Sequence, residues 1–230
     1  MGKLVVIEGL DGCGKTIQTT KLSERLLADK YNLRLIDFPQ YDSDSSFFVK
    51  KYLDGTYGTD PNNVSAQQAA LCYAMDRFHL FKSALGEFRD FLNEENSILL
   101  ANRYTTSNML FQAAKITDKN EVKKFLVWLE NLEYNILEIP RPDLTFLLYM
   151  PIEHSIRLMK GRDIELQAKK NNMSNDIHEN NEHFLKMVAD RAPFIAEHQN
   201  FEVINCIEGN ELRTAEDINN EIYAKVKRLF

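Results

Sequence analysis

Residues 4–16 read LVVIEGLDGCGKT, and they give the clearest indication of the fold, because a short apolar run passes directly into a glycine-rich loop. Residues 4–7 are apolar without interruption, which is typical of a strand covered on both faces. Residues 9–16 match the pattern G-x-x-x-x-G-K-[ST] in full. Because this pattern belongs between a strand and a helix, we expect a helix to begin at the end of the loop.

The residue types of this loop suit the binding of a nucleoside triphosphate with Mg²⁺ as cofactor. Glycines let consecutive backbone N–H groups turn inward around an anion, and the following helix points its positive N-terminus at the phosphates. Lys15 can reach the β- and γ-phosphates of ATP, and the hydroxyl of Thr16 can ligate Mg²⁺. The residues predicted to bind ATP are Gly9, Leu10, Asp11, Gly12, Cys13, Gly14, Lys15 and Thr16.

Apolar runs alternate with longer helical patterns along the rest of the chain, as in a parallel sheet with crossover helices. The expected strands cover residues 3–8, 33–37, 97–102, 144–150 and 201–206. The expected helices cover residues 14–29, 65–93, 119–137 and about 180–198, with a last one opened by Thr214. Ser65 and Gln68 read as a capping box. The pattern predicts an α/β fold, a three-layer α/β/α sandwich with a five-stranded parallel sheet, in a single domain over residues 1–230.

Length and composition exclude several classes of protein. A chain of 230 residues with 44% apolar and 27% charged residues can bury a core, so it is neither disordered nor fibrous. The net charge of −6 argues against a general nucleic-acid or membrane-surface role. Cys13, Cys72 and Cys206 form no CxxC pair, so no disulfide framework or zinc site is indicated. Without a signal region or a long apolar run, we expect a soluble, cytoplasmic protein.

One stretch does not fit as core. Residues 162–183 are rich in asparagine and charge and poor in apolar anchors. Two interpretations stay open, a solvated surface loop and a mobile lid, since active-site lids come from weakly packed segments of this kind. As a hypothesis we place a helical lid at about residues 157–180.

Three further elements indicate where a phosphate acceptor would bind. Asp37-Phe38-Pro39 follows the second strand, and open α/β sheets bind ligands at the carboxyl ends of their strands. Tyr73 and Arg77 stand four residues apart and share a helix face, so they could stack on a base and hydrogen-bond its edge. Tyr73 could instead belong to the core. Arg103 ends the third strand, where its fork of donors could bridge the donor and acceptor phosphates.

Together these motifs resemble those of thymidylate kinases, the enzymes that phosphorylate dTMP to dTDP with ATP. The matching stretches span nearly the whole chain in family order: residues 8–16, Phe38-Pro39, Tyr73 with Arg77, residues 103–107 and residues 176–179. The resemblance implies a P-loop nucleoside monophosphate kinase fold and the small-molecule substrates ATP and dTMP. It also implies a homodimer and no nucleic-acid or membrane partner.

The resemblance assigns roles to individual residues. Asp11 would accept a hydrogen bond from the 3′-hydroxyl of the acceptor sugar, and Arg103 would bind the dTMP phosphate. Tyr73 would stack on thymine, and Arg77 would hydrogen-bond its carbonyl edge. The other substrate-binding residues that it implies are Phe38, Pro39, Ser107, Asn108, Phe111 and Gln112.

Phosphoryl transfer needs positive charge near the transferred group in its transition state. Some thymidylate kinases carry an Arg inside the P-loop, where this sequence has Gly12 and Cys13. The chain therefore resembles the other subtype, in which basic lid residues supply the charge. We expect Arg157 or Arg162 to reach the γ-phosphate, with Lys160 as a further candidate and Lys169 and Lys170 as weaker ones. The predicted catalytic residues are Lys15, Arg103, Arg157 and Arg162.

One position departs from the family pattern. The residue before Arg103 is usually acidic, and here it is Asn102. Glu8 or Asp11 could compensate, or Mg²⁺ could be held by Thr16, waters and the phosphates alone, because Mg²⁺ uses few protein ligands. Two alternative functions stay open: a kinase for another pyrimidine deoxynucleotide, and a nucleotide-binding regulator without catalysis.

Overall fold

All five expected strands join one sheet in the computed structural model, which describes residues 1–83, 87–160 and 176–230, with the backbone alone for Arg89 and Lys160. They are β1 Lys3–Gly9, β2 Asn32–Asp37, β3 Ser97–Asn102, β4 Leu144–Tyr149 and β5 Glu202–Asn205. The order across the sheet is β2-β3-β1-β4-β5, and every neighbouring pair is parallel. The strand that leads into the P-loop therefore lies at the centre of the sheet.

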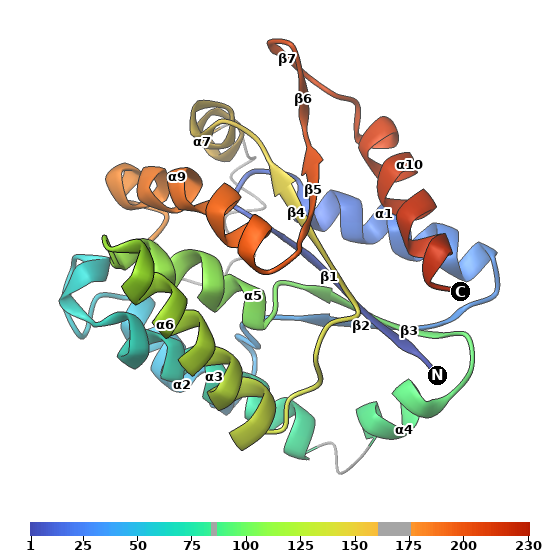
Figure 1. Cartoon of the computed structure of the whole chain (residues 1–230), viewed down its shortest axis with the longest axis horizontal. Coiled ribbons are helices and arrows are strands. Elements are labelled where there is room, and N and C mark those ends of the chain that lie inside the picture. Colours follow the sequence, from blue (N-terminus) through green and yellow to red (C-terminus); the bar gives the residue numbers. More distant parts are fainter. Residues whose placement is uncertain (84–86, 161–175) are drawn as a thin grey trace.

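Helices cover both faces of this sheet (Figure 1). One face is covered by α1 (Lys15–Ala28) and α10 (Ala215–Val226), whose apolar side chains pack against β1. The opposite face is covered by α3 (Ala66–Ser83), α4 (Glu87–Asn93), α6 (Lys119–Glu130) and α9 (Glu182–His198). The three-layer α/β/α sandwich is confirmed.

Short elements connect these layers. Two π-helical turns are η3 Asn108–Gln112, which follows β3 and α5, and η5 Asn131–Ile136, which follows α6. The remaining elements are η1 Asp44–Ser46, α2 Phe47–Leu53, η2 Pro61–Asn63, α5 Thr105–Ser107, η4 Ala113–Lys115, α7 Ile152–Lys160, β6 Ile207–Glu208, β7 Glu211–Leu212 and η6 Lys227–Leu229. Strands β6 and β7 form a separate antiparallel hairpin.

The expected single helix over residues 65–93 is wrong in one respect, because the structure divides it into α3 and α4, with residues 84–86 outside the described part. The two helices bury different side chains. Ala70 of α3 packs in the cluster that α6 and α9 share, whereas Phe91 of α4 packs against Leu99 of the sheet. The predicted start is confirmed, since the backbone N–H of Gln68 donates to Ser65 Oγ at 3.2 Å and that of Ser65 to Gln68 Oε1 at 3.1 Å.

Most of the predicted lid lies outside the described residues. Its flanks are α7 on one side and, on the other, a turn over residues 177–180 that leads into α9. Among the described residues, no helix is both long and apolar enough to span a bilayer.

Candidate active site

The glycines of the P-loop adopt backbone conformations that side chains disfavour. Gly12 and Gly14 have φ angles of 86° and 92°, in the left-handed region. A Cβ on Gly12 would also lie 2.5 Å from the carbonyl oxygen of Ser155 on α7. The loop therefore needs glycine here to turn beneath α7 and deliver Lys15 to the first turn of α1.

Lys15 folds back over its own loop. Its Nζ donates to the carbonyl oxygens of Gly9 at 3.0 Å and Leu10 at 2.8 Å, and lies 3.7 Å from Asp11 Oδ1. Burial lowers the pKa of Lys15, and the positive charge of Arg103 lowers it further. This ammonium is therefore inside the site, surrounded by oxygen atoms.

Arg103 links the P-loop to the segment that follows β3. Its Nη2 donates to Asp11 Oδ1 at 2.7 Å, and its Nη1 lies 3.6 Å from Glu8 Oε1. Burial lowers the pKa of Arg103, but the carboxylates of Asp11 and Glu8 outweigh that effect and raise it above its ordinary value. The backbone of Arg103 has a φ of 64°, uncommon for a residue with a side chain. A permanent positive charge is thus fixed beside the phosphate loop.

Glu8 organises the residues around Arg103 from inside the core. The side chain is fully buried, and one oxygen accepts the backbone N–H of Gly9 at 2.9 Å. The other accepts the hydroxyls of Thr106 at 3.0 Å and Ser107 at 2.6 Å. Ser107, a predicted substrate residue, is therefore tied to the strand that carries the P-loop.

A buried ion pair lies on the acceptor side. The Nε of Arg77 donates to Glu133 Oε2 at 3.0 Å, and its Nη2 bonds Glu133 Oε1. Burial lowers the pKa of Arg77, whereas the charge of Glu133 raises it, and the net direction is upward. Asn108 donates to Glu133 Oε1 at 3.1 Å and to the carbonyl of Ala70 at 3.1 Å. Two predicted base-pocket residues thus share one carboxylate.

Sequence reasoning missed Glu133, although a signal was present. Leu126 and Leu129 mark the buried face of α6, and Glu133 continues the same face four residues after Leu129. An acidic residue within an apolar stripe indicates a buried partner, because an unpaired buried charge is costly.

A second buried network stacks on Phe111. The ring of His178 lies parallel to that of Phe111, 5.6 Å between centroids. Lys115 Nζ donates to Tyr52 Oη at 2.8 Å, and Tyr52 Oη lies 2.8 Å from His178 Nε2. Burial lowers the pKa of Lys115 to about 7 and that of His178 to about 3. A neutral His178 imidazole that accepts a hydrogen bond from the Tyr52 hydroxyl is consistent with both lowered pKa values.

Sequence reasoning missed Tyr52 and Lys115 of this network. Neither residue lies in a motif that carries chemistry, so only the fold reveals that they meet His178.

The other predicted substrate residues lie at different depths. Tyr73 is half-buried, with its ring edge-on to Tyr52 at 6.2 Å. Phe38 is buried, its ring 6.0 Å from that of Tyr104, and Pro39 is half-buried. Gln112 is 1% exposed, and its Oε1 accepts no hydrogen bond in the described structure.

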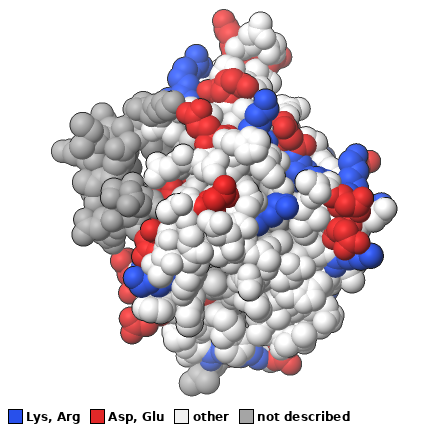
Figure 2. All heavy atoms as spheres, turned by 90° about the vertical axis from the view of Figure 1, so that its left-hand side faces the viewer, with Lys and Arg blue, Asp and Glu red and all other residues white. Residues whose placement is uncertain are grey.

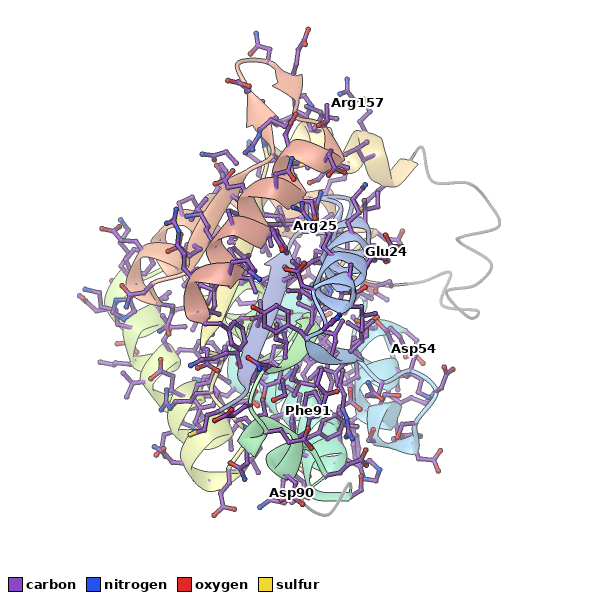
Figure 3. The ribbon with its side chains drawn as sticks, turned by 90° about the vertical axis from the view of Figure 1, so that its right-hand side faces the viewer. Glu24, Arg25, Asp54, Asp90, Phe91 and Arg157 are labelled. Atoms are coloured by element: carbon purple, nitrogen blue, oxygen red, sulfur yellow. The ribbon has the colours of Figure 1, made fainter. Side chains whose placement is uncertain are left out.

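Arg157 is the one predicted lid cation whose side chain lies among the described residues. Ser155 and Met159 are the residues of α7 that meet Gly12. Arg157 lies two residues from each, so it projects from a different side of the helix; it is exposed and 3.1 Å from His154 Nδ1 (Figure 3). Arg162, Lys169 and Lys170 lie outside the described residues, and so does the side chain of Lys160.

Comparisons with known proteins identify the family. A family model described as thymidylate kinase matches residues 7–212. A probable thymidylate kinase of Pyrococcus horikoshii is 30% identical over 177 residues, which cover 73% of this chain and 78% of that protein. The thymidylate kinase of Mycobacterium tuberculosis is 29% identical over 160 residues, covering 69% and 71% of the two chains.

A solved structure supports the fold independently of close sequence similarity. The thymidylate kinase of Candida albicans superposes with a TM-score of 0.64 at 20% identity, covering 99% of this chain and 92% of that one. With the family model matching most of the chain, the conclusion is that this protein belongs to the thymidylate kinase family.

Proposed function

We propose that the protein transfers the γ-phosphoryl group of ATP to the phosphate of dTMP, releasing dTDP and ADP. Family membership supports this reaction, and so do the names of its relatives. The observation that carries the proposal is the 2.7 Å hydrogen bond from Arg103 to Asp11, because it joins the phosphate loop to the acceptor side of the site. A kinase needs both phosphates held at this junction.

Catalysis would rest on positioning and charge neutralisation. The backbone N–H groups of the P-loop and the ammonium of Lys15 would hold the β- and γ-phosphates, replacing the carbonyls of Gly9 and Leu10 as its partners. Arg103 would hold the acceptor phosphate, so that an oxygen of this phosphate attacks the γ-phosphorus of ATP in line. Since that oxygen is the nucleophile, no covalent intermediate on the protein is expected.

The base pocket would use the hydrogen-bond donor of Arg77 that the buried ion pair with Glu133 does not occupy. Glu133 occupies Nε and Nη2 of Arg77, whereas Nη1 makes only a 3.4 Å contact with the carbonyl of Tyr104. Nη1 is therefore the donor that would address a thymine carbonyl. Gln112 Oε1, buried without a hydrogen-bond donor in the described structure, would accept from the same ligand.

Mg²⁺ fits the donor set of this site. Thr16 stands in the first turn of α1 and is exposed, so its hydroxyl would be the protein ligand. No group of three or more His, Cys, Asp or Glu side chains in the described chain could hold an ion alone. That suits Mg²⁺, which binds substrate phosphates and water with few protein ligands and neutralises charge on the transferred group.

Assembly and location follow from the same proposal. We expect a homodimer through what we term the α2–α3 surface, formed by four exposed apolar side chains on two packed helices: Phe47, Phe48, Leu71 and Met75. Figure 2 shows a broad area without Lys, Arg, Asp or Glu on the side of the molecule that these helices border. Cytoplasmic location stays a prediction; Cys13, Cys72 and Cys206, which are all free thiols, are compatible with it.

A coupled ADP-release assay with ATP and Mg²⁺ tests the reaction, comparing dTMP with dUMP, dCMP, dGMP, UMP and thymidine. We expect strong preference for dTMP. Arg103→Ala should lower kcat by about 10³-fold or more, because it removes the positive charge that would hold the acceptor phosphate next to the transferred group. Arg228→Ala, an exposed arginine of η6, is the matched control and should turn over normally.

Two outcomes would contradict the proposal. Equal turnover of another monophosphate would keep the kinase but reject the thymine pocket. ATP binding without product from any acceptor would instead favour a regulator that has lost catalysis.

A further inference from the structure

The side-chain alternation of the strands separates the acidic groups at the catalytic edge. Val5 and Ile7 of β1, with Ile98 and Leu100 of β3, pack on the face that α1 covers. Leu4, Val6 and Ile36 pack on the opposite face. Since successive side chains alternate, Asp37 and Asn102 point to the α1 face, on which Lys15 and Thr16 begin the helix.

The pairing register places Asp37 beside Asn102. Residue 102 pairs with Asp37 on one side and with Ile7 on the other, so both stand at the end of the sheet next to the P-loop. The side chain of Asn102 lowers the pKa of Asp37. The charges of Arg103 and Lys15 also act on this carboxyl, although burial dominates and raises its pKa. Its surroundings are therefore those of the phosphate site.

Asp37 is the carboxylate at a strand end that is able to bind a hydrated cation. Among the last two residues of the five strands, all of them described, only Glu8 and Asp37 are acidic. Glu8 is fully buried and points to the other face, toward the hydroxyls of Thr106 and Ser107. Asp11, in the loop, is paired with Arg103 and Lys15. Asp37, unlike Glu8, keeps contact with solvent although the surrounding protein partly buries its carboxyl group.

We propose that Asp37 supplies the acidic group that P-loop enzymes place opposite the loop Thr to hold Mg²⁺ through its water shell. Such enzymes use an aspartate at a strand end for this purpose, and in this chain it stands on β2 in place of β3. Asn102 is its partner in the strand pairing, and the Oδ1 of Asn102 is buried without a hydrogen-bond partner in the described structure. The inference rests on the proposed phosphoryl transfer.

Mn²⁺ binding followed by EPR, with the enzyme loaded with a non-hydrolysable ATP analogue, tests this directly. Asp37→Asn should weaken Mn²⁺ binding by about 10-fold or more, the usual effect of losing an outer-shell partner. Its affinity for the analogue in EDTA should not change. In Asp37→Asn combined with Asn102→Asp, the carboxylate moves to the neighbouring strand end on the same face, and the Mn²⁺ affinity should return.

The control is Asp90→Asn on α4, an exposed carboxylate remote from Arg157 and the P-loop end of the molecule (Figure 3). Thermal unfolding of each variant without nucleotide separates loss of metal from loss of fold, and Asp37→Ser provides a second neutral variant. Unchanged Mn²⁺ affinity in folded Asp37→Asn overturns the inference, as does an equal loss in Asp90→Asn. No dTMP is present, so failure of the proposed acceptor would leave this result unaffected.

Discussion

Arg77 and Glu133 form a charged pair in the apolar interior, where removing one partner costs more than removing both. The side chains are 2% and 0% exposed. Glu133→Ala should lower the free energy of unfolding by about 3–5 kcal/mol, because it leaves a buried guanidinium without its carboxylate. Arg77→Met with Glu133→Leu should recover most of that stability, since no buried charge remains. Urea denaturation at pH 7 measures both.

The same pair also tests function. The stable double variant should bind dTMP more weakly than the wild type, since it lacks the donor proposed for the thymine carbonyl. Glu121→Ala, an exposed acid at the start of α6, serves as the stability control. A double variant as unstable as Glu133→Ala would show that the pair stabilises the fold as a pair.

His178 gives the protein a stability that depends on pH. Its pKa is lowered to about 3, mainly by burial, from an ordinary value near 6.5. Between these values the unfolded chain binds a proton that the folded chain does not, so stability falls as the pH drops through this window. The loss between pH 7 and pH 5 is about 2 kcal/mol. His178→Gln, which keeps an acceptor for Tyr52, should remove this loss.

Urea titrations at pH 7 and pH 5 provide the comparison. His183→Gln, on the exposed face of α9, should keep the wild-type slope. Asp176, whose pKa burial raises to about 6, titrates with the opposite sign and is present in all three proteins, so its effect cancels. Equal slopes in His178→Gln and wild type would show that His178 is not neutral in the fold.

Sequence reasoning placed the P-loop correctly between a strand and a helix, because the motif is local. Residues 9–16 lie contiguously and follow one strand, so their assembly needs no long-range information. Glu133 and Lys115 were missed because their roles depend on partners 56 and 63 residues away, which only packing reveals. The roles implied for Arg157 and Arg162 depend on a segment whose structure is mostly undescribed.

At the scale of elements, the start of helix α3 could be predicted from the sequence, whereas its end could not. The capping box at Ser65 is local and was predicted, whereas the division of α3 from α4 was not. Ser65→Ala should lower the free energy of unfolding by about 1 kcal/mol, since the backbone N–H of Gln68 loses its acceptor, Ser65 Oγ. Ser65→Asn should keep most of it, and chemical denaturation of both tests this. An unchanged free energy of unfolding in Ser65→Ala would show that the cap contributes nothing.

The strands were predicted within two residues at each end, but their order was not predicted. The order β2-β3-β1-β4-β5 depends on which apolar faces α1, α10, α3 and α9 cover together. Periodicity reports which face of an element is buried and not what buries it. For the same reason the neighbourhood of Asp37 and Asn102, which are 65 residues apart in sequence, becomes visible only in the assembled sheet.

The whole molecule presents the α2–α3 surface, where periodicity alone cannot distinguish a core stripe from an interface stripe. Leu71 and Met75 are 42% and 44% exposed on α3, and Phe47 and Phe48 are 52% and 53% exposed on α2. Burying these side chains against a second copy would stabilise a dimer, because burial of apolar surface drives association. Met75→Glu should therefore yield a monomer by light scattering after gel filtration. Leu27 is also an exposed apolar residue, 56% exposed on α1, so Leu27→Glu is the control and should stay dimeric. A wild-type protein that is monomeric at every concentration would refute the proposed dimer.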